Sequence, residues 1–166
     1  MGLFKEMTRV SKVGYIETPS PSGEIVHHNE LPYLGSVHHR FILWTNKADN
    51  SLNILPKYAL LEYLQQMPLF QSMYTQATSL LQSHIVYWNN YYIWSDSDHL
   101  HQSKLLLHQH EVGLYDLRIP ESYLQVIQAG INQSQEATEH LLLSNRITVR
   151  EYTDWELNRE RLANFP

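Results

Sequence analysis

The chain has 166 residues, 43% hydrophobic and 17% charged, a length and balance that predict one globular domain. It contains no cysteine, which excludes disulfides, thiol catalysis and zinc–thiolate sites and favours a reducing compartment. Its formal net charge is −5, and no Lys or Arg occurs between Lys57 and Lys104. Because binding to phosphates needs clustered positive charge, nucleic acid is not expected as a non-specific ligand.

Targeting features are absent from the sequence pattern. Residues 1–10 contain Lys5, Glu6 and Arg9 and no apolar run, unlike a secretory signal. No stretch approaches 18 consecutive apolar residues, so we expect no membrane span. The predicted location is cytoplasmic, with export by a non-classical route left open.

The first 35 residues are predicted to be an N-terminal strand and loop extension, and residues 36–166 the main body. Residues 9–17 alternate loosely as a strand, residues 18–23 are loop-forming, and residues 24–28 suit a short partner strand. Residues 37–45 are rich in β-branched and aromatic residues and predict another strand, which ends at turn-forming residues 46–50.

Two helices are predicted next in the chain. Pro56 suits a first helical turn, and apolar residues then repeat at helical spacing through residues 60–67. The pattern restarts at Pro68, and residues 69–81 keep one apolar face for more than three turns. This second helix is expected to pack on the core.

Residues 85–94 are strongly aromatic and predict two short strands around Asn89 and Asn90, because asparagine tolerates the positive φ of a hairpin turn. One continuous strand with a bulge is the alternative. A polar helix capped by Ser95 or Asp96 is expected to reach about His110, followed by a strand over residues 114–119.

The last part of the chain predicts a helix, a strand and a helix. Pro120 opens a helix with Tyr123, Leu124, Ile127 and Ile131 on one face. Residues 139–149 suit a strand, and a capping box begins a helix over residues 153–164. Together these elements predict an α+β fold with a central, mostly antiparallel sheet and packed helices.

Ten histidines are the most unusual feature of the composition. Most come in close pairs, whose members are His27 and His28, His38 and His39, His99 and His101, and His108 and His110. On a helix, ligands that share a face are three or four residues apart, so the last two pairs point apart. We therefore expect no metal site, and a histidine-based metal-dependent enzyme is a remaining alternative.

Two further groups are chemical candidates. Glu136 and Glu139 lie three residues apart, which indicates either a surface pair on a helix or a catalytic glutamate at a cleft. The aromatic residues of segment 85–94 fall on both faces of a strand, so one face can pack in the core. The other can stack a planar ligand or contact a partner, as in a non-enzymatic inhibitor or immunity-type protein.

The order of motifs over residues 36–155 resembles the ADP-ribosyltransferase-like superfamily. The segments on which the resemblance rests are the early strand VHHRF at residues 37–41, the aromatic strand end YYIWSD at 91–96, GLYDLRIP at 113–120, and TEHLLL at 138–143. The two helices that follow the early strand also fit that layout. The resemblance implies a protein that uses or binds NAD, with a protein as target or partner.

The resemblance also implies a site. His38 or His39 would hold the hydroxyls of the NAD ribose, Tyr91 or Tyr92 would stack on the nicotinamide, and Glu139 would stabilise developing positive charge. Strand alternation favours His38, Tyr92 and Glu139 as the residues that face a common cleft.

Overall fold

The computed structural model describes residues 6–7, 9–26, 34–35, 38–58, 61, 68–94, 102–105 and 119–147. Within these ranges the chain has the α+β architecture that the sequence predicts. In chain order the elements are β1 (Gly14–Pro19), α2 (Pro21–Glu24), β2 (Phe41–Asn46), β3 (Ser51–Pro56), α3 (Pro68–Ser83), the 3₁₀ helix η2 (Ile85–Trp88), β4 (Asn89–Trp94), β5 (Gln102–Leu105) and α4 (Glu121–Leu143).

The described strands form two sheets. β1 pairs antiparallel with β4, and a second sheet has the order β2-β3-β5. β2 and β3 are antiparallel and are joined by a tight turn in which Asn50 adopts a φ of 47°, a conformation that asparagine tolerates. β5 runs parallel to β3. The pairing is therefore mostly antiparallel, as expected.

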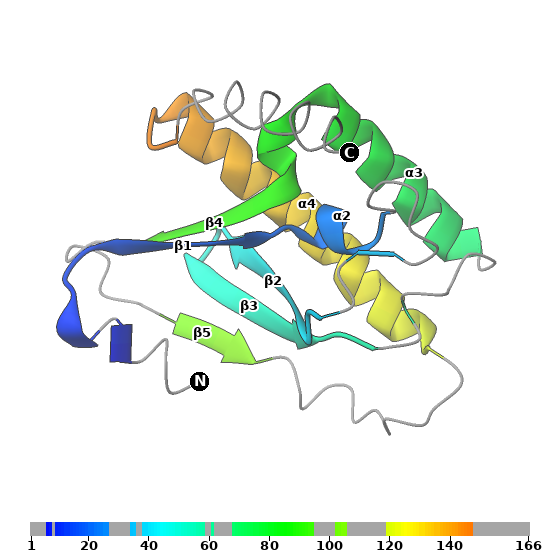
Figure 1. Ribbon diagram of the computed structural model, residues 1–166, viewed down its shortest axis with the longest axis horizontal. Coiled ribbons are helices and arrows are strands. Elements are labelled where there is room, and N and C mark those ends of the chain that lie inside the picture. The colour runs from blue at the N-terminus through cyan, green and yellow to red at the C-terminus, as the bar shows by residue number, and fades with distance from the viewer. Residues whose placement is uncertain are drawn as a thin grey trace, which may run out of the picture.

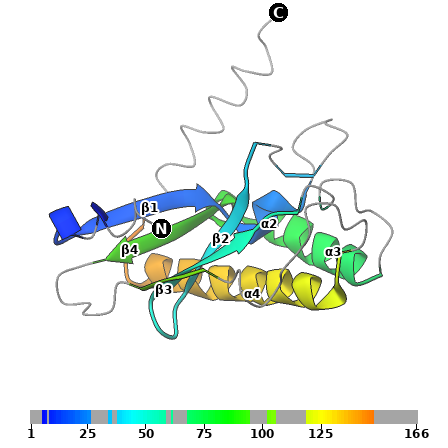
Figure 2. The ribbon, with the colours of Figure 1, turned by 90° about the horizontal axis from the view of Figure 1, so that it is seen from below.

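The helices α3 and α4 lie side by side on the same side of the strands (Figures 1 and 2). α3 is the predicted helix, and its buried residues recur at the spacing of one helical face: Phe70, Met73, Ala77 and Leu81. α4 begins after Pro120 and ends where Asn145 adopts a φ of 54°, with Arg146 N donating to Leu141 O at 2.9 Å. No helix within the described ranges combines the length and apolar character needed to cross a membrane.

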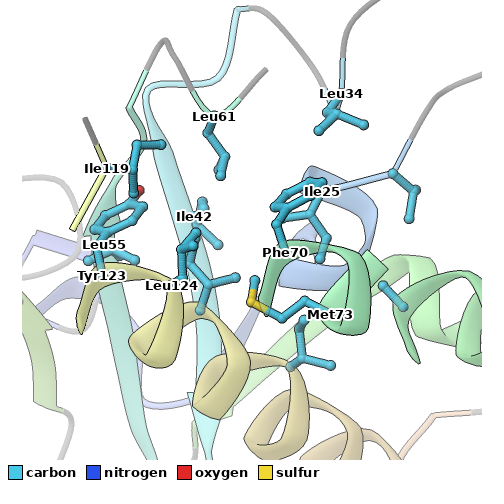
Figure 3. Close-up of a cluster of buried hydrophobic side chains, with 14 of the residues drawn as sticks. Ile25, Leu34, Ile42, Leu55, Leu61, Phe70, Met73, Ile119, Tyr123 and Leu124 are labelled. Atoms are coloured by element: carbon cyan, nitrogen blue, oxygen red, sulfur yellow. The ribbon is translucent and has the colours of Figure 1, made fainter. Parts of the chain in front are cut away.

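The main core lies between these helices and the sheet of β2 and β3 (Figure 3). Ile42 and Leu55 project from the strands toward Met73 and Leu124, and all four side chains are buried. Ile25 and Leu34, from the predicted N-terminal extension, join the same cluster. Residues 1–35 therefore contribute one strand and part of the core to the described fold.

Several predicted elements differ from the structure. Residues 85–88 form a 3₁₀ helix, so the aromatic hairpin is wrong and only its second half is a strand. The polar helix expected up to His110 is wrong at residues 102–105, which form β5. The late strand expected from Glu139 is wrong because α4 continues to Leu143. In each case pairing or packing with distant residues overrides the local pattern.

The early strands also differ in position. β1 begins at Gly14, and β2 begins at Phe41, so His38 and His39 precede the strand that was expected to hold them. Glu24 ends a helix rather than starting a strand, and β3 was not predicted. Elements predicted over residues 114–118 and 153–164, and over 60–67 apart from Leu61, lie outside the described residues.

Candidate functional site

Glu139 lies on α4, three residues after Glu136, so both glutamates are helical, as one of the two interpretations expected. Its Oε1 accepts a hydrogen bond from Gln135 Nε2 at 2.9 Å and from the Tyr87 hydroxyl at 3.4 Å. Burial raises the pKa of Tyr87, and the neighbouring Glu139 carboxylate raises it further. A tyrosine hydroxyl does lie beside Glu139, and it is that of Tyr87.

Tyr91 and Tyr92 are both buried and point to opposite faces of β4. Tyr91 packs in a cluster with Val86 and Leu141, on the face that α4 covers. Tyr92 packs with Leu52 and Trp94, on the other face. Because successive strand residues alternate, Tyr92 points away from α4 and from Glu139.

His38 and His39 lie toward the opposite end of α4 from Glu139. The following strand β2 begins at Phe41, which pairs with Pro56, and Pro56 O accepts a hydrogen bond from the Tyr123 hydroxyl in the first turn of α4. Glu139 is 16 residues further along the same helix, or about 24 Å at 1.5 Å per residue. The structure therefore does not bring His38, Tyr92 and Glu139 together.

One of the predicted residues, His39, does belong to a polar cluster, which we call the Glu24 site and define as Glu24, His39 and Lys57. His39 Nδ1 is hydrogen-bonded to Glu24 Oε1, and Lys57 Nζ donates to Glu24 Oε2 at 2.9 Å. The side chains of Glu24 and Lys57 are only 2% and 1% exposed, whereas that of His39 is 39% exposed. The Glu24–Lys57 ion pair is thus buried, and the imidazole of His39 is the part of the site that contacts solvent.

Three short segments position this site. Ser20 caps α2 by accepting from Gly23 N at 3.1 Å, and it anchors the helix by donating to Tyr87 O at 2.6 Å. Gly35 has a φ of +60°, and a Cβ there would lie 2.2 Å from Glu24 O, so only glycine fits beside this carboxylate-bearing turn. Lys57 N donates to Arg40 O at 2.9 Å, which joins the segments that carry Lys57 and His39.

Sequence reasoning missed Glu24 and Lys57. Their positions are 33 residues apart, and the segment that begins at Glu24 was interpreted as a short partner strand. The available signal was the context of each residue, because both are single charged residues beside apolar neighbours, as in GEIV and LPKY. Buried charges are nearly always paired, so two such residues are candidates for each other.

The geometry of the Glu24 site defines its chemistry. An ionised carboxylate only accepts hydrogen bonds, so the bond to Glu24 places the proton of the neutral imidazole on Nδ1. In that tautomer Nε2 carries the lone pair of the ring, which can accept from a proton donor or bind a ligand. Within the described part of the chain, no three histidine and carboxylate side chains are arranged to hold a metal ion. The pairs His27 and His28, His99 and His101, and His108 and His110 lie outside it.

Comparisons of this chain with protein-family models, with curated proteins and with solved structures find no match.

Proposed function

We propose that this chain is a general acid–base enzyme in which the imidazole of His39 transfers a proton. The observation that carries the proposal is the sharing of one buried carboxylate, that of Glu24, between an ammonium and a solvent-contacting imidazole. A positioned histidine is the commonest group for proton transfer in enzymes. Holding its Nδ1–H fixes both the tautomer and the ring orientation.

The division of roles within the site supports this proposal. Burying a carboxylate is unfavourable unless it is paired, and Lys57 alone provides a pair for Glu24. The second carboxylate oxygen is not needed for neutralisation, and it holds the one member of the site that reaches solvent. A purely anchoring ion pair has no requirement for an oriented, accessible imidazole.

NAD, which the resemblance implies as ligand, enters this proposal as one substrate to be tested. An NAD site built on His39 would not include Tyr92 and Glu139, because these residues lie elsewhere in the fold. Release of nicotinamide from NAD would require a proton acceptor for the attacking nucleophile, a role that His39 Nε2 fits.

We expect His39→Gln to lower turnover by about 10²–10⁴-fold, the usual contribution of general acid–base catalysis. His38→Gln is the matched control, because His38 is the adjacent histidine and is exposed. Purified wild type and both variants would be assayed with p-nitrophenyl acetate, p-nitrophenyl phosphate and NAD. Equal rates for all three proteins, or a loss confined to His38→Gln, would contradict the proposal.

The tautomer provides a check that does not depend on substrate. Long-range ¹H–¹⁵N spectra should show the His39 proton on Nδ1 in the neutral form, and His38→Gln should leave this signal unchanged. A His39 proton on Nε2 would exclude the Glu24 hydrogen bond as the orienting contact.

A further inference from the structure

Arg40 lies next to the Glu24 site and directly opposite one of its members. Lys57 N donates to Arg40 O at 2.9 Å, which extends the ladder of β2 and β3 by one pair beyond Phe41 and Pro56. Opposite residues of an antiparallel pair project to the same face, with Cβ atoms about 4.5–5.5 Å apart. The side chain of Arg40 therefore leaves the backbone beside that of Lys57.

The course of the Lys57 side chain shows which face this is. Ile42 and Leu55, the next pair on the same face, are buried in the main core, and Lys57 extends on that side to the carboxylate of Glu24. His39 Nδ1 is bonded to the other oxygen of that carboxylate, so its ring is on this side of the ladder as well. The imidazole, the ammonium and the neighbouring arginine thus extend from the same side.

The charge of Arg40 is not needed inside the site. Lys57 already balances the carboxylate of Glu24. Arg40 is exposed, and among the residues that the structure describes its guanidinium has neither a hydrogen bond nor an ion pair. The exposed guanidinium of Arg9, by contrast, is paired with Glu6. The surface beside the Glu24 site therefore presents one unmatched positive charge next to an imidazole that contacts solvent.

We propose that the substrate of the Glu24 site is a small organic anion, a phosphate or a carboxylate, whose oxygens are bound by the guanidinium of Arg40. This inference rests on the proposed proton transfer by His39 and adds the group that holds the substrate. A guanidinium is a rigid planar fork of N–H donors, which binds the oxygens of phosphate and carboxylate in a bidentate manner. An anion held there brings the rest of the substrate toward Nε2 of His39, on the adjacent residue.

The surrounding charge favours a small anion over a nucleic acid. A polyanion is bound by several Lys and Arg side chains, each of which neutralises a phosphate. The chain has a formal net charge of −5, and no Lys or Arg occurs between Lys57 and Lys104. One exposed guanidinium beside one imidazole instead matches a ligand with a single anionic group.

Binding can be measured without turnover. Isothermal titration calorimetry of the full chain with phenyl phosphate, benzoate and benzyl alcohol should show that at least one of the two anions binds and that the neutral alcohol does not. Arg40→Gln should weaken binding of the anion by about 10–100-fold, the usual contribution of a charge-assisted hydrogen bond. Arg40→Lys, which keeps the charge but not the planar fork, should give an intermediate affinity.

The matched control is Lys47→Gln, which removes one exposed positive charge just after the other end of β2 and should bind as the wild type does. Arg40→Gln should remain folded, because the bond between Arg40 and Lys57 is made by main-chain atoms. Binding of neither anion, equal binding of benzyl alcohol, or the same loss in Arg40→Gln and Lys47→Gln would overturn the proposal.

One further variant separates this inference from the proposed function. His39→Gln should lose turnover but keep most of the affinity for the anion, because Arg40 makes the contact. Binding that depends on Arg40, without any turnover that depends on His39, would reject the proton transfer and retain the anion site. Turnover of p-nitrophenyl acetate that depends on His39, with unchanged anion binding in Arg40→Gln, would reject the anion site and retain the proton transfer.

Discussion

Tyr123 shows how one side chain contributes both apolar and polar stabilisation. Its ring is buried in the main core against Tyr58, with ring centroids 4.5 Å apart, and its hydroxyl donates to Pro56 O at 2.7 Å. Burial raises the pKa of Tyr123 well above its usual range. The sequence predicts the buried ring from its helical spacing, but it contains no signal for the hydroxyl partner, which comes from β3.

The raised pKa of Tyr123 makes the free energy of unfolding depend on pH in the alkaline range. The folded state favours the neutral phenol of Tyr123. The contribution of this phenol to the free energy of unfolding is complete below the unfolded-state pKa of about 10, and it is lost as the pH rises toward the folded-state pKa. In urea titrations above pH 10, the free energy of unfolding of Tyr123→Phe should fall less steeply than that of wild type, by up to about 1.4 kcal/mol per pH unit. Tyr15→Phe, at an exposed ring, should retain the wild-type slope; equal slopes for wild type and Tyr123→Phe would contradict the assignment.

At the scale of elements, α4 packs closely on β2 because Gly130 has no side chain. A Cβ at Gly130 would lie 3.0–3.2 Å from three atoms of the Trp44 ring system, and Trp44 is held in place by its Nε1 donating to Gln133 Oε1 at 2.8 Å. Glycine in a helix interior is unfavourable by about 1 kcal/mol relative to alanine. The close contact with the indole explains why glycine is tolerated there.

We expect Gly130→Leu to destabilise the protein by more than about 2 kcal/mol, because a bulky side chain must displace a buried indole. Ala129→Leu is the matched control, one position earlier on the exposed face of α4, and it should change stability by less than about 0.5 kcal/mol. Thermal or urea unfolding of both variants measures the difference. Similar stabilities would show that α4 can move away from β2 without penalty.

Local sequence patterns predicted the helices, because their buried residues recur at helical spacing within one segment. α3 and the first turns of α4 follow from the spacing of residues such as Met73, Ala77 and Ile127 along one helix face. β3 and β5 were not predicted, since Pro56 suggested a helix start and residues 102–104 are polar. The pairing of both strands depends on register between distant segments. The Glu24 site was not predicted for the same reason: only His39 was singled out, and its partners come from other segments.

At the scale of the whole molecule, a side chain links the two described sheets. The buried Asn90 of β4 accepts from Thr45 N of β2 at 2.7 Å and donates to Thr18 Oγ1 of β1 at 3.3 Å. The Thr45 hydroxyl completes the contact by donating to Tyr91 O at 2.8 Å. β4 and β2 are thus joined by hydrogen bonds of side-chain amide and hydroxyl groups.

Asn90→Ala should therefore cost about 1–3 kcal/mol, because it leaves the buried Thr45 N–H without its acceptor. Amide hydrogen exchange should show faster exchange at Thr45 in this variant. Asn89→Ala is the control, since the Asn89 side chain bonds Glu17 at an exposed position, and it should be nearly neutral. Unchanged protection at Thr45 in Asn90→Ala would exclude the amide as the link between the sheets.

The joint at Asn90 also constrains how this sequence can diverge. A backbone ladder accepts almost any residue, because its hydrogen bonds come from groups that all residues except proline share. The joint instead requires one side chain that accepts toward β2 and donates toward β1. In descendants of this chain, position 90 should change only together with positions 18 and 45, so covariation among these three positions would mark the boundary between the two sheets.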